Sequence, residues 1–404
     1  MEPRTLPGFR DFLPVEAKKR QWLKRKLEEI CESWGYDPME TPTLEFLEIF
    51  TGQIGDDEKL FFKFTDPGGR EVALRYDQTV PSVRVIAANQ NNLVKPFKRY
   101  QIQPAFRAEK PQKGRYREFV QCDADIFGDP SPYADAETIA LSLDIYRRLG
   151  FKQAKVLIND RSLMAGFPYD AIVSVDKIKK IGEEGVLEEM QKKGLFLTDA
   201  RAFIRNIKEL KPNETISIIL DYLDKCGFDK SWYAFDPTIA RSFAYSQGPI
   251  WEVEIPGFTA GSVLGGERYD GLFKSLFGIE MSGTGFGLGF DRTLEAAEQF
   301  GLVPQIKTSS QVLVTIFSPN LLDKSLETTV SLRQKKINTE IYLDPNAKLD
   351  KQLKYADQKD IPFAVIIGPD EATKNLVTLK NLLTKSQITA TLDECIKSIT
   401  PSSP

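Results

Sequence analysis

The sequence predicts an α+β protein of two or three domains, and three observations lead to this fold class. Residues 99–128 contain two strand patterns joined by a charged loop. Residues 161–229 are rich in lysine, glutamate and leucine at helical spacing. After residue 310, short apolar runs typical of strands alternate with helical patterns. We therefore expect a region of paired strands, a helical insertion within it, and a separate α/β domain towards the C-terminus.

The first part of the chain alternates between helical and strand patterns. Residues 15–34 predict an amphipathic helix, because their apolar side chains recur at steps of three and four. Residues 35–46 resemble a strand that Pro38 and Pro42 interrupt. The next expected elements are a β-hairpin turning at 67–69, a helix over 79–90, strands over 96–108 and 116–128, a helix over 129–151 and a buried strand over 155–160.

The last part of the chain predicts a return to strands and then a different domain. Residues 249–255 and 261–266 have strand patterns, and residues 283–300 predict a glycine-rich strand that runs into a helix. Beyond residue 310, three strands and two helices predict a small three-layer α/β domain with a largely parallel sheet. The expected boundaries are 1–160 and 230–307 for the strand-rich region, 161–229 for the helical insertion and 311–404 for the last domain.

The chain contains no histidine among its 404 residues. This excludes a Ser-His-Asp triad, a histidine general base and a histidine metal ligand. The four cysteines stand singly, so their spacing predicts neither a zinc site nor a disulfide framework, and we expect no metal-ligating residues. Any chemistry must therefore use carboxylates, arginines, lysines, a bound metal ion or the substrate itself.

Charge and hydropathy bear on the partners and the compartment. The net charge is −3, so no global positive field attracts nucleic acid, and any such contact must use local patches. The N-terminal residues lack the apolar core of a signal peptide, and no apolar run approaches membrane-spanning length. We expect a cytoplasmic protein without a membrane partner.

The charged segment 99–128 raises the question of what it binds. Gln121 and Asp125 are four residues apart on one predicted strand and share a face, and Arg107 could project towards the same surface. A guanidinium grips phosphate, whereas a carboxylate receives an ammonium or a ring N–H. A nucleoside triphosphate beside an amino acid is a ligand with both signs. The alternative is a solvated, salt-bridged hairpin tip, and this segment alone does not decide between them.

Several long stretches together resemble class II aminoacyl-tRNA synthetases, in the form that histidyl-tRNA synthetases use. The run FKRYQIQPAFRAEKPQKGRYREFVQCDADIFG resembles their second signature motif, GYDPMETPTLE the first with Pro42 as its proline, and GFGLGFDRT the third with Arg292 as its arginine. LRYDQTVPSVR resembles the amino-acid-binding segment, GGERYDGL a further block, and KLDKQLKYADQKDIPFAVIIGPDE the anticodon-binding domain. The resemblance covers nearly the whole chain in the family's order.

The resemblance implies an antiparallel sheet flanked by helices, a helical insertion and a C-terminal anticodon-binding domain. It implies an enzyme that activates histidine with ATP and Mg²⁺ and transfers it from histidyl-adenylate to the 3′ end of its tRNA. It also implies a homodimer with the region of Pro42 at the interface.

The resemblance further assigns roles residue by residue. Arg107 and Arg241 would act in the activation step. The implied ATP-binding residues are Arg107, Glu109, Arg115, Phe119 and Arg292, and the implied amino-acid-binding residues are Asp77, Thr79, Gln121, Asp125, Arg241, Tyr245 and Ser246. Each has a plain structural alternative; Asp77, for example, could simply cap a helix that begins near Thr79.

One block departs from the family pattern. The usual Arg-Gly-Leu-Asp-Tyr-Tyr-Thr-Gly reads RSFAYSQG at residues 241–248, and Ser246 replaces a tyrosine that contacts the substrate ring. Two other hypotheses therefore accompany the leading one. The chain could be a regulatory paralogue of the kind that serves ATP phosphoribosyltransferase, or a class II enzyme for another amino acid. The retained residues 311–398, Arg107 and Arg292 argue against the regulatory paralogue.

Overall fold

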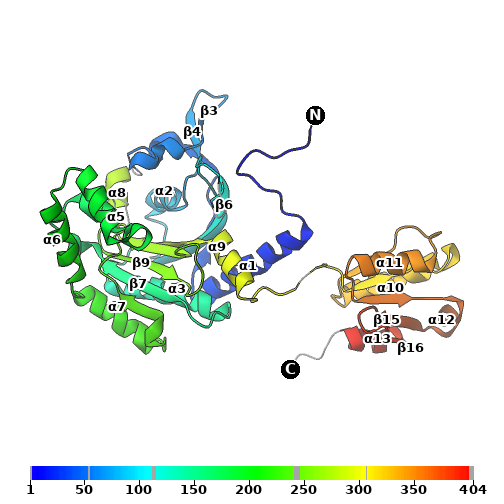
Figure 1. The fold of residues 1–404 in the computed structure, drawn as a ribbon. Helices are drawn as coiled ribbons and strands as arrows, with labels where there is room; N and C mark the ends of the chain where they lie inside the picture. The colour runs from blue at the N-terminus through cyan, green and yellow to red at the C-terminus, as the bar shows by residue number, and fades with distance from the viewer. Residues whose placement is uncertain (1, 53–54, 112–114, 241–245, 306, 400–404) are drawn as a thin grey trace. The chain divides into compact units, whose positions relative to one another are not determined.

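The protein divides into two compact units, which Figure 1 shows in a computed structural model. The structure describes residues 2–52, 55–111, 115–240, 246–305 and 307–399. The first unit comprises Met1–Asp11 with Arg20–Val303, and the second comprises Phe12–Lys19 with Pro304–Pro404. Among the described residues, no helix is both long and apolar enough to cross a membrane.

An eight-stranded sheet with the order β1-β5-β6-β11-β10-β9-β7-β8 organises the first unit. The pairs from β5 through β6, β11, β10 and β9 to β7 are all antiparallel, and only the edge pairs β1–β5 and β7–β8 are parallel. The predicted antiparallel sheet flanked by helices is therefore confirmed. Its strands are β1 Asp37–Pro38, β5 Phe97–Phe106, β6 Glu118–Phe127, β7 Lys155–Asp160, β8 Tyr233–Phe235, β9 Pro249–Glu254, β10 Leu264–Arg268 and β11 Gly283–Gly289.

The two faces of this sheet have opposite character. Successive side chains of a strand point to opposite faces, so Tyr100, Cys122 and Ala124 lie on one face with Phe286 and Leu288. These side chains belong to the largest apolar core of the protein. The helices whose buried side chains complete this core are α1 Pro14–Ser33, α3 Pro132–Arg148, α7 Glu214–Lys225 and α9 Phe290–Gln299.

The other face carries polar and charged side chains. Arg99 lies opposite Asp125, and Gln101 lies opposite Asp123, in the register of β5 and β6. All four are buried. Because ionised groups are costly to bury without partners, this face requires compensating charges and hydrogen bonds.

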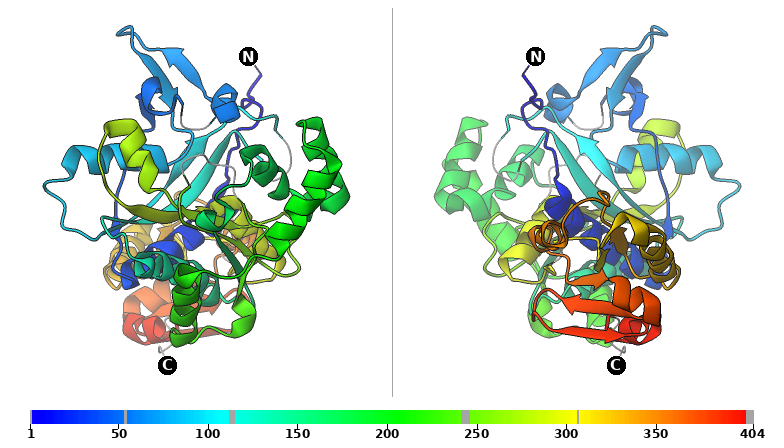
Figure 2. Two further views of the ribbon diagram at one scale, coloured as in Figure 1. Left: turned by 90° about the vertical axis from the view of Figure 1, so that its left-hand side faces the viewer. Right: turned by 90° about the vertical axis from the view of Figure 1, so that its right-hand side faces the viewer.

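A small second sheet with the order β2-β4-β3 accompanies the large one. The predicted hairpin is present: β3 Lys63–Thr65 and β4 Glu71–Leu74 pair antiparallel on either side of residues 67–69. This hairpin extends away from the large sheet (Figures 1 and 2). The strand expected over residues 35–46 is divided into β1 and β2 Leu44–Phe46, as the interrupting prolines predict. Helices α2 Thr79–Asn89 and α8 Asp270–Phe277 share a second apolar core.

The region of helical periodicity contains four α-helices after a short 3₁₀ turn, η3 Arg161–Met164. The helices are α4 Tyr169–Val175, α5 Ile178–Lys192, α6 Leu197–Lys208 and α7. Helices α4, α5 and α6 share an apolar core of their own. Helix α7 differs, because its buried Ile216, Ile219 and Leu223 belong to the core of the large sheet. The boundaries of the helical insertion remain a prediction.

The second unit has a five-stranded sheet with the order β13-β12-β14-β15-β16. Successive side chains of β12 belong to two separate apolar cores, with Val312 and Val314 in one and Leu313 in the other. Because there is one core on each face of the sheet, the predicted three layers are present. The bounds are β12 Val312–Val314, α10 Leu322–Gln334, β13 Thr339–Ile341, α11 Leu349–Gln358, β14 Phe363–Ile366, α12 Pro369–Lys374, β15 Val377–Asn381, β16 Gln387–Ala390 and α13 Leu392–Ile399.

The expectation of a largely parallel sheet in this unit is wrong. Strand β12 is parallel to β13 and β14, but the pairs β14–β15 and β15–β16 are antiparallel. Only residues 382–386 join β15 to β16, and such a short connection permits only an antiparallel pair, because a parallel pair needs a long crossover. The sheet is therefore mixed.

Candidate functional site

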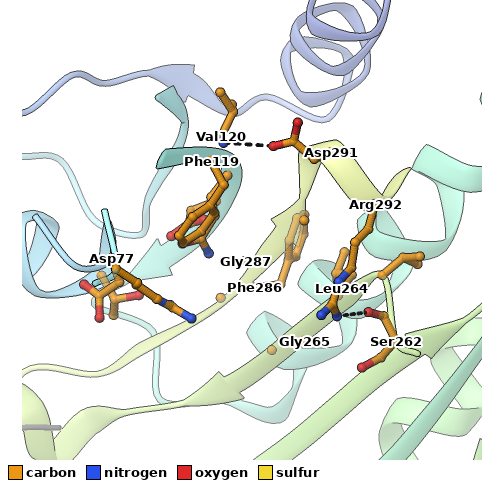
Figure 3. Close-up of a pocket in the computed structure, with 18 of the residues that line it drawn as sticks. Asp77, Phe119, Val120, Ser262, Leu264, Gly265, Phe286, Gly287, Asp291 and Arg292 are labelled. Atoms are coloured by element: carbon orange, nitrogen blue, oxygen red, sulfur yellow. Dashed lines mark hydrogen bonds between the residues drawn. The ribbon is translucent and has the colours of Figure 1, made fainter. Parts of the chain in front are cut away.

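The polar face of the large sheet forms the floor of a pocket (Figure 3). Strand β6 contributes Phe119, Gln121, Asp123 and Asp125, which alternate with the core residues of the same strand. Strands β10 and β11 contribute a floor that is rich in glycine. The walls come from Asp77 and Thr79 at the start of α2, from Arg107, Glu109 and Arg115 after β5, and from Arg292 on α9.

Glycines in β11 make room for the side chains of β6 on the floor of the pocket. A Cβ on Gly285 would lie 1.9 Å from Oδ1 of Asp125, and one on Gly287 would lie 2.8 Å from Nε2 of Gln121. The side chains of β6 therefore lean over β11, and any larger residue at 285 would collide with the Asp125 carboxylate. The glycine-rich pattern of this strand is a requirement of the site.

Arginines, among them Arg107 and Arg292, line the pocket. The Arg107 guanidinium lies 4.2 Å from the ring centre of Tyr76 and 5.1 Å from that of Phe119, and its Nε donates to the Tyr76 carbonyl at 3.3 Å. Nη1 of Arg292 donates to the Ser262 carbonyl at 3.0 Å (Figure 3). Burial lowers the pKa of Arg292. The rings of Tyr76 and Phe119 orient Arg107, and the Ser262 carbonyl orients Arg292, so that both guanidinium groups can receive an anion.

Buried carboxylates line the same pocket. Asp125 is 2% exposed, with its Oδ2 at 2.5 Å from Nη2 of Arg99, and Tyr269 donates its hydroxyl to Oδ1 at 2.5 Å. Burial raises the pKa of Asp125, against the lowering effect of Arg99. Burial also raises the pKa of Asp123, on the same strand. The pocket thus combines arginines with buried carboxylates, as a ligand with both signs requires.

Asp77 lies near Arg107 and also supports a helix. Its Oδ1 accepts the backbone N–H of Val80 at 3.1 Å, which is the capping role considered as the plain alternative. It lines the pocket as well, and burial raises its pKa. The two roles are compatible, because a carboxylate has several acceptor positions.

The structure brings most of the predicted residues together. Those that line this one pocket are Asp77, Thr79, Arg107, Glu109, Arg115, Phe119, Gln121, Asp125 and Arg292. Arg115 also forms an ion pair of 3.3 Å with Glu109. Ser246 is buried and donates its hydroxyl to the Glu267 carboxylate. Arg241 and Tyr245 lie outside the described residues. The individual roles assigned to all these residues remain predictions.

Several pocket residues escaped the sequence analysis. Asp123 lies two residues from both Gln121 and Asp125 on the same strand, so its side chain points to the same face. This spacing could have predicted it from the sequence. Glu267 and Tyr269 lie in the stretch GGERYDGL, which was recognised as a block without a role.

Asp291 also escaped the analysis, and its partners come from distant parts of the sequence. Its carboxylate pairs with Arg10 at 2.8 Å and Arg20 at 2.5 Å. It also accepts the Val120 N–H at 3.3 Å (Figure 3). Such long-range pairing leaves no local pattern in a sequence.

The acidic side chains of the pocket do not form a metal site. Among the residues that the structure describes, no group of three histidine, cysteine, aspartate or glutamate side chains could hold a metal ion. The pocket carboxylates instead pair with Arg99, Tyr269 and Ser246.

The antiparallel sheet with its polar pocket and the attached α/β unit define the architecture of a class II aminoacyl-tRNA synthetase. A family model described as "Histidyl-tRNA synthetase" matches residues 8–195, and one described as "Anticodon binding domain" matches residues 311–400. The histidine–tRNA ligase of Cytophaga hutchinsonii is 37% identical, with 98% of this chain and 99% of that protein covered. That of Aeropyrum pernix is 35% identical, with 98% of each covered. The chain belongs to the histidyl-tRNA synthetase family.

Solved structures agree with this family. The histidyl-tRNA synthetase of Nostoc sp. PCC 7120 has a TM-score of 0.85 at 27% identity, with 99% of this chain and 100% of that chain covered. A structure described as an ATP phosphoribosyltransferase regulatory subunit/histidyl-tRNA synthetase from Bacillus halodurans has a TM-score of 0.71 at 24% identity, with 87% and 96% covered. The second likeness shows the fold alone.

The buried pair Arg99–Asp125 yields a stability prediction. Arg99→Met leaves Asp125 and Asp123 buried without their cation, so the free energy of unfolding should fall by about 3–5 kcal/mol at pH 8. The loss should shrink as the pH falls to 5. Burial raises the pKa of both carboxyl groups in the folded protein, so acidification protonates them there first and removes the uncompensated charges.

Urea titration followed by tryptophan fluorescence measures this loss, because Trp22, Trp34, Trp232 and Trp251 all lie in the first unit. Arg70→Met, which removes an exposed partner of Asp66, is the matched control and should cost about 1 kcal/mol or less. An Arg99→Met loss that did not depend on pH would show that the carboxylates are not the reason for it.

Proposed function

We propose that the chain is a histidine–tRNA ligase that forms histidyl-adenylate from histidine and ATP and transfers the histidyl group to the 3′ end of its tRNA. The observation that carries this proposal is the pocket that combines arginines with buried carboxylates, in a chain of this family. ATP would lie against Arg107 and Arg292, and the α-ammonium and side chain of histidine against the carboxylates. The carboxylate of histidine would meet the α-phosphate between them.

Each pocket residue is assigned a part of ATP or of histidine. Arg107 contacts the α-phosphate and the reacting carboxylate, and Arg292 holds the γ-phosphate. Glu109 and Arg115 contact the adenine and the phosphates, and Phe119 stacks on the base. Asp77 and Thr79 bind the α-ammonium, while the histidine ring lies against Gln121, Asp125 and Tyr245, and Arg241 acts in the activation step. The phosphate-binding roles of Arg107 and Arg292 are supported by the position of both side chains in the lining of the pocket.

Adenylate formation needs no histidine side chain on the enzyme. The substrate carboxylate is ionised and is itself the nucleophile, so no general base is required. It attacks the α-phosphorus, pyrophosphate leaves, and the arginines stabilise the charge that develops on the phosphate oxygens. The protein contributes position and charge, because both substrates are held by groups that are already buried and oriented.

Mg²⁺ fits this site as an ion that arrives with ATP. The described residues offer no carboxylate cage, and Mg²⁺ is often held mainly by substrate phosphates and water. It would neutralise phosphate charge beside Arg107 and Arg292.

Transfer to tRNA and assembly complete the proposal. Residues 311–404 would bind the anticodon of histidine tRNA, while 1–160 and 230–307 would form the catalytic core around an insertion at 161–229. Two chains would form a homodimer through the region of Pro42, and the enzyme would work in the cytoplasm, where tRNA is charged. The family model matched by residues 311–400 supports the anticodon-binding role. It also disfavours a regulatory paralogue without aminoacylation, which would not need that domain.

Arg107→Ala should abolish adenylate formation. The side chain faces the pocket and contributes little to the core, so the protein should fold while ATP–pyrophosphate exchange falls by about 10²–10³-fold or more. Tryptophan fluorescence checks the fold, and Arg70→Ala, an exposed arginine, should exchange normally. A folded Arg107→Ala protein with normal ATP–pyrophosphate exchange would contradict the role assigned to Arg107.

Deletion of residues 311–404 should separate the two reactions. The rate of ATP–pyrophosphate exchange should stay within about threefold of that of the full chain, because the first unit has its own core and should fold alone. Charging of histidine tRNA should fall by about 100-fold or more, since the contact with the anticodon is lost. Both are measured on the same preparation, and a truncated protein that charged tRNA normally would rule out the anticodon-binding role.

A further inference from the structure

A second carboxylate lies opposite Asp125 across the floor of the pocket. In the register of the sheet, Asp125 of β6 is opposite Gly285 of β11, and Gly285 is opposite Glu267 of β10. Directly opposite residues of antiparallel strands project to the same face, so the two acidic side chains flank a position without a side chain. Neighbouring strands lie about 4.8 Å apart, which puts their Cα atoms about 10 Å from each other.

The space between these carboxylates suits a small ring. Glu267 is 6% exposed and lines the pocket, as Asp125 does. The Asp125 carboxylate already leans over Gly285, within 1.9 Å of where a Cβ would be. A planar five-membered ring would therefore lie above the Asp125 carboxylate in the pocket, and not directly on Gly285, with Glu267 on its other side.

The same region contains the departure from the family pattern. Ser246 replaces the tyrosine that contacts the substrate ring, and Ser246 donates its short hydroxyl to Glu267. The serine therefore holds the carboxylate of Glu267. A tyrosine hydroxyl can donate or accept a hydrogen bond, whereas an ionised carboxylate only accepts.

We infer that Glu267 is a specificity-determining residue, which supplies the second acceptor for the ring and binds histidine as imidazolium. This inference rests on the proposed function. With Asp125 accepting from one ring nitrogen and Glu267 from the other, both nitrogens must carry a proton. Histidine, with a ring pKa of about 6.5, is mostly neutral above pH 7, so binding must take up a proton from solution.

The charges around Glu267 favour this cationic ring. Asp123 and Asp125 of β6 line the same pocket as Glu267. Tyr269, two residues after Glu267 in the sequence, lines it as well. The charge of Arg161 of η3 interacts with Glu267, and the Arg161 side chain also donates to the Ala240 carbonyl at 2.8 Å. The charge of Arg107 acts on Asp123. Arg99 is paired with Asp125. A cation beside Asp123 and Asp125 would favour their ionised form, so any proton on these carboxyl groups would be released when histidine binds. Such a release would oppose the proton uptake by the histidine ring.

Calorimetric titration of the full chain with histidine tests the inference. At pH 8, in two buffers of different ionisation enthalpy, the wild type should take up about one proton per histidine bound. Its dissociation constant should rise by about 20-fold between pH 6 and pH 8, because the imidazolium fraction falls.

Glu267→Gln should bind neutral histidine without proton uptake, because its amide can donate to an unprotonated ring nitrogen. Its affinity at pH 6 should be about 10- to 100-fold weaker than that of the wild type, since a charged hydrogen bond is lost. Glu280→Gln, which removes an exposed partner of Lys274, should match the wild type. Should Glu267→Gln fail to fold, the wild-type proton uptake still decides whether imidazolium is bound, and Glu267→Asp should retain it.

The outcomes separate the two proposals. Histidine binding without proton uptake by the wild type, or equal uptake by folded Glu267→Gln, would overturn the role of Glu267 and leave the ligase proposal intact if histidine supports exchange. ATP–pyrophosphate exchange with each of the twenty amino acids, run on the wild type, checks the ligase proposal itself. Exchange that histidine does not support, or that another amino acid supports better, would overturn that proposal.

Discussion

The alternation of side chains along β5, β6, β11 and β10 is the constraint on which the rest of the first unit depends. The side chains on one face, among them Tyr100, Ala124 and Phe286, belong to an apolar core. Those on the other face include the charged side chains that line the pocket. A slip of one residue in any of these strands would exchange the two sets. Register and function are therefore linked, because the residue pattern that makes the core also aims Asp125 and Gln121 into the pocket.

Burying charge beside a core has a cost that the surrounding residues must offset. Arg99 and Tyr269 both bind Asp125, so its carboxylate is oriented before any substrate arrives. Arg107 and Arg292 are oriented by aromatic rings and carbonyls, which leaves their charge available. A site that is prepared in this way does not need to reorganise when phosphate charge develops, and this is the main source of catalysis proposed for it.

The absence of histidine from the sequence is consistent with this chemistry. Substrate carboxylate and phosphates supply the reacting groups, and arginines and carboxylates bind them, so no side chain has to transfer a proton in the activation step. It also follows that synthesis of this chain consumes no histidine. For a histidine–tRNA ligase, this means that translation of the enzyme does not depend on its own product.

The sequence by itself determined the α+β class, most of the strands and helices of the first unit, though not β8 or α8, and the pocket residues that lie in long motifs, such as Arg107 and Asp125. These follow from local periodicity and from motif order, which a linear chain displays directly. The mixed sheet of the second unit, the partners of Asp291 and the position of Glu267 opposite Asp125 came only from the tertiary structure. The reason is physical: strand pairing and long-range ion pairs join residues far apart in the chain, and the register that puts Glu267, Gly285 and Asp125 in one row is set by packing between strands that have no local signal for each other.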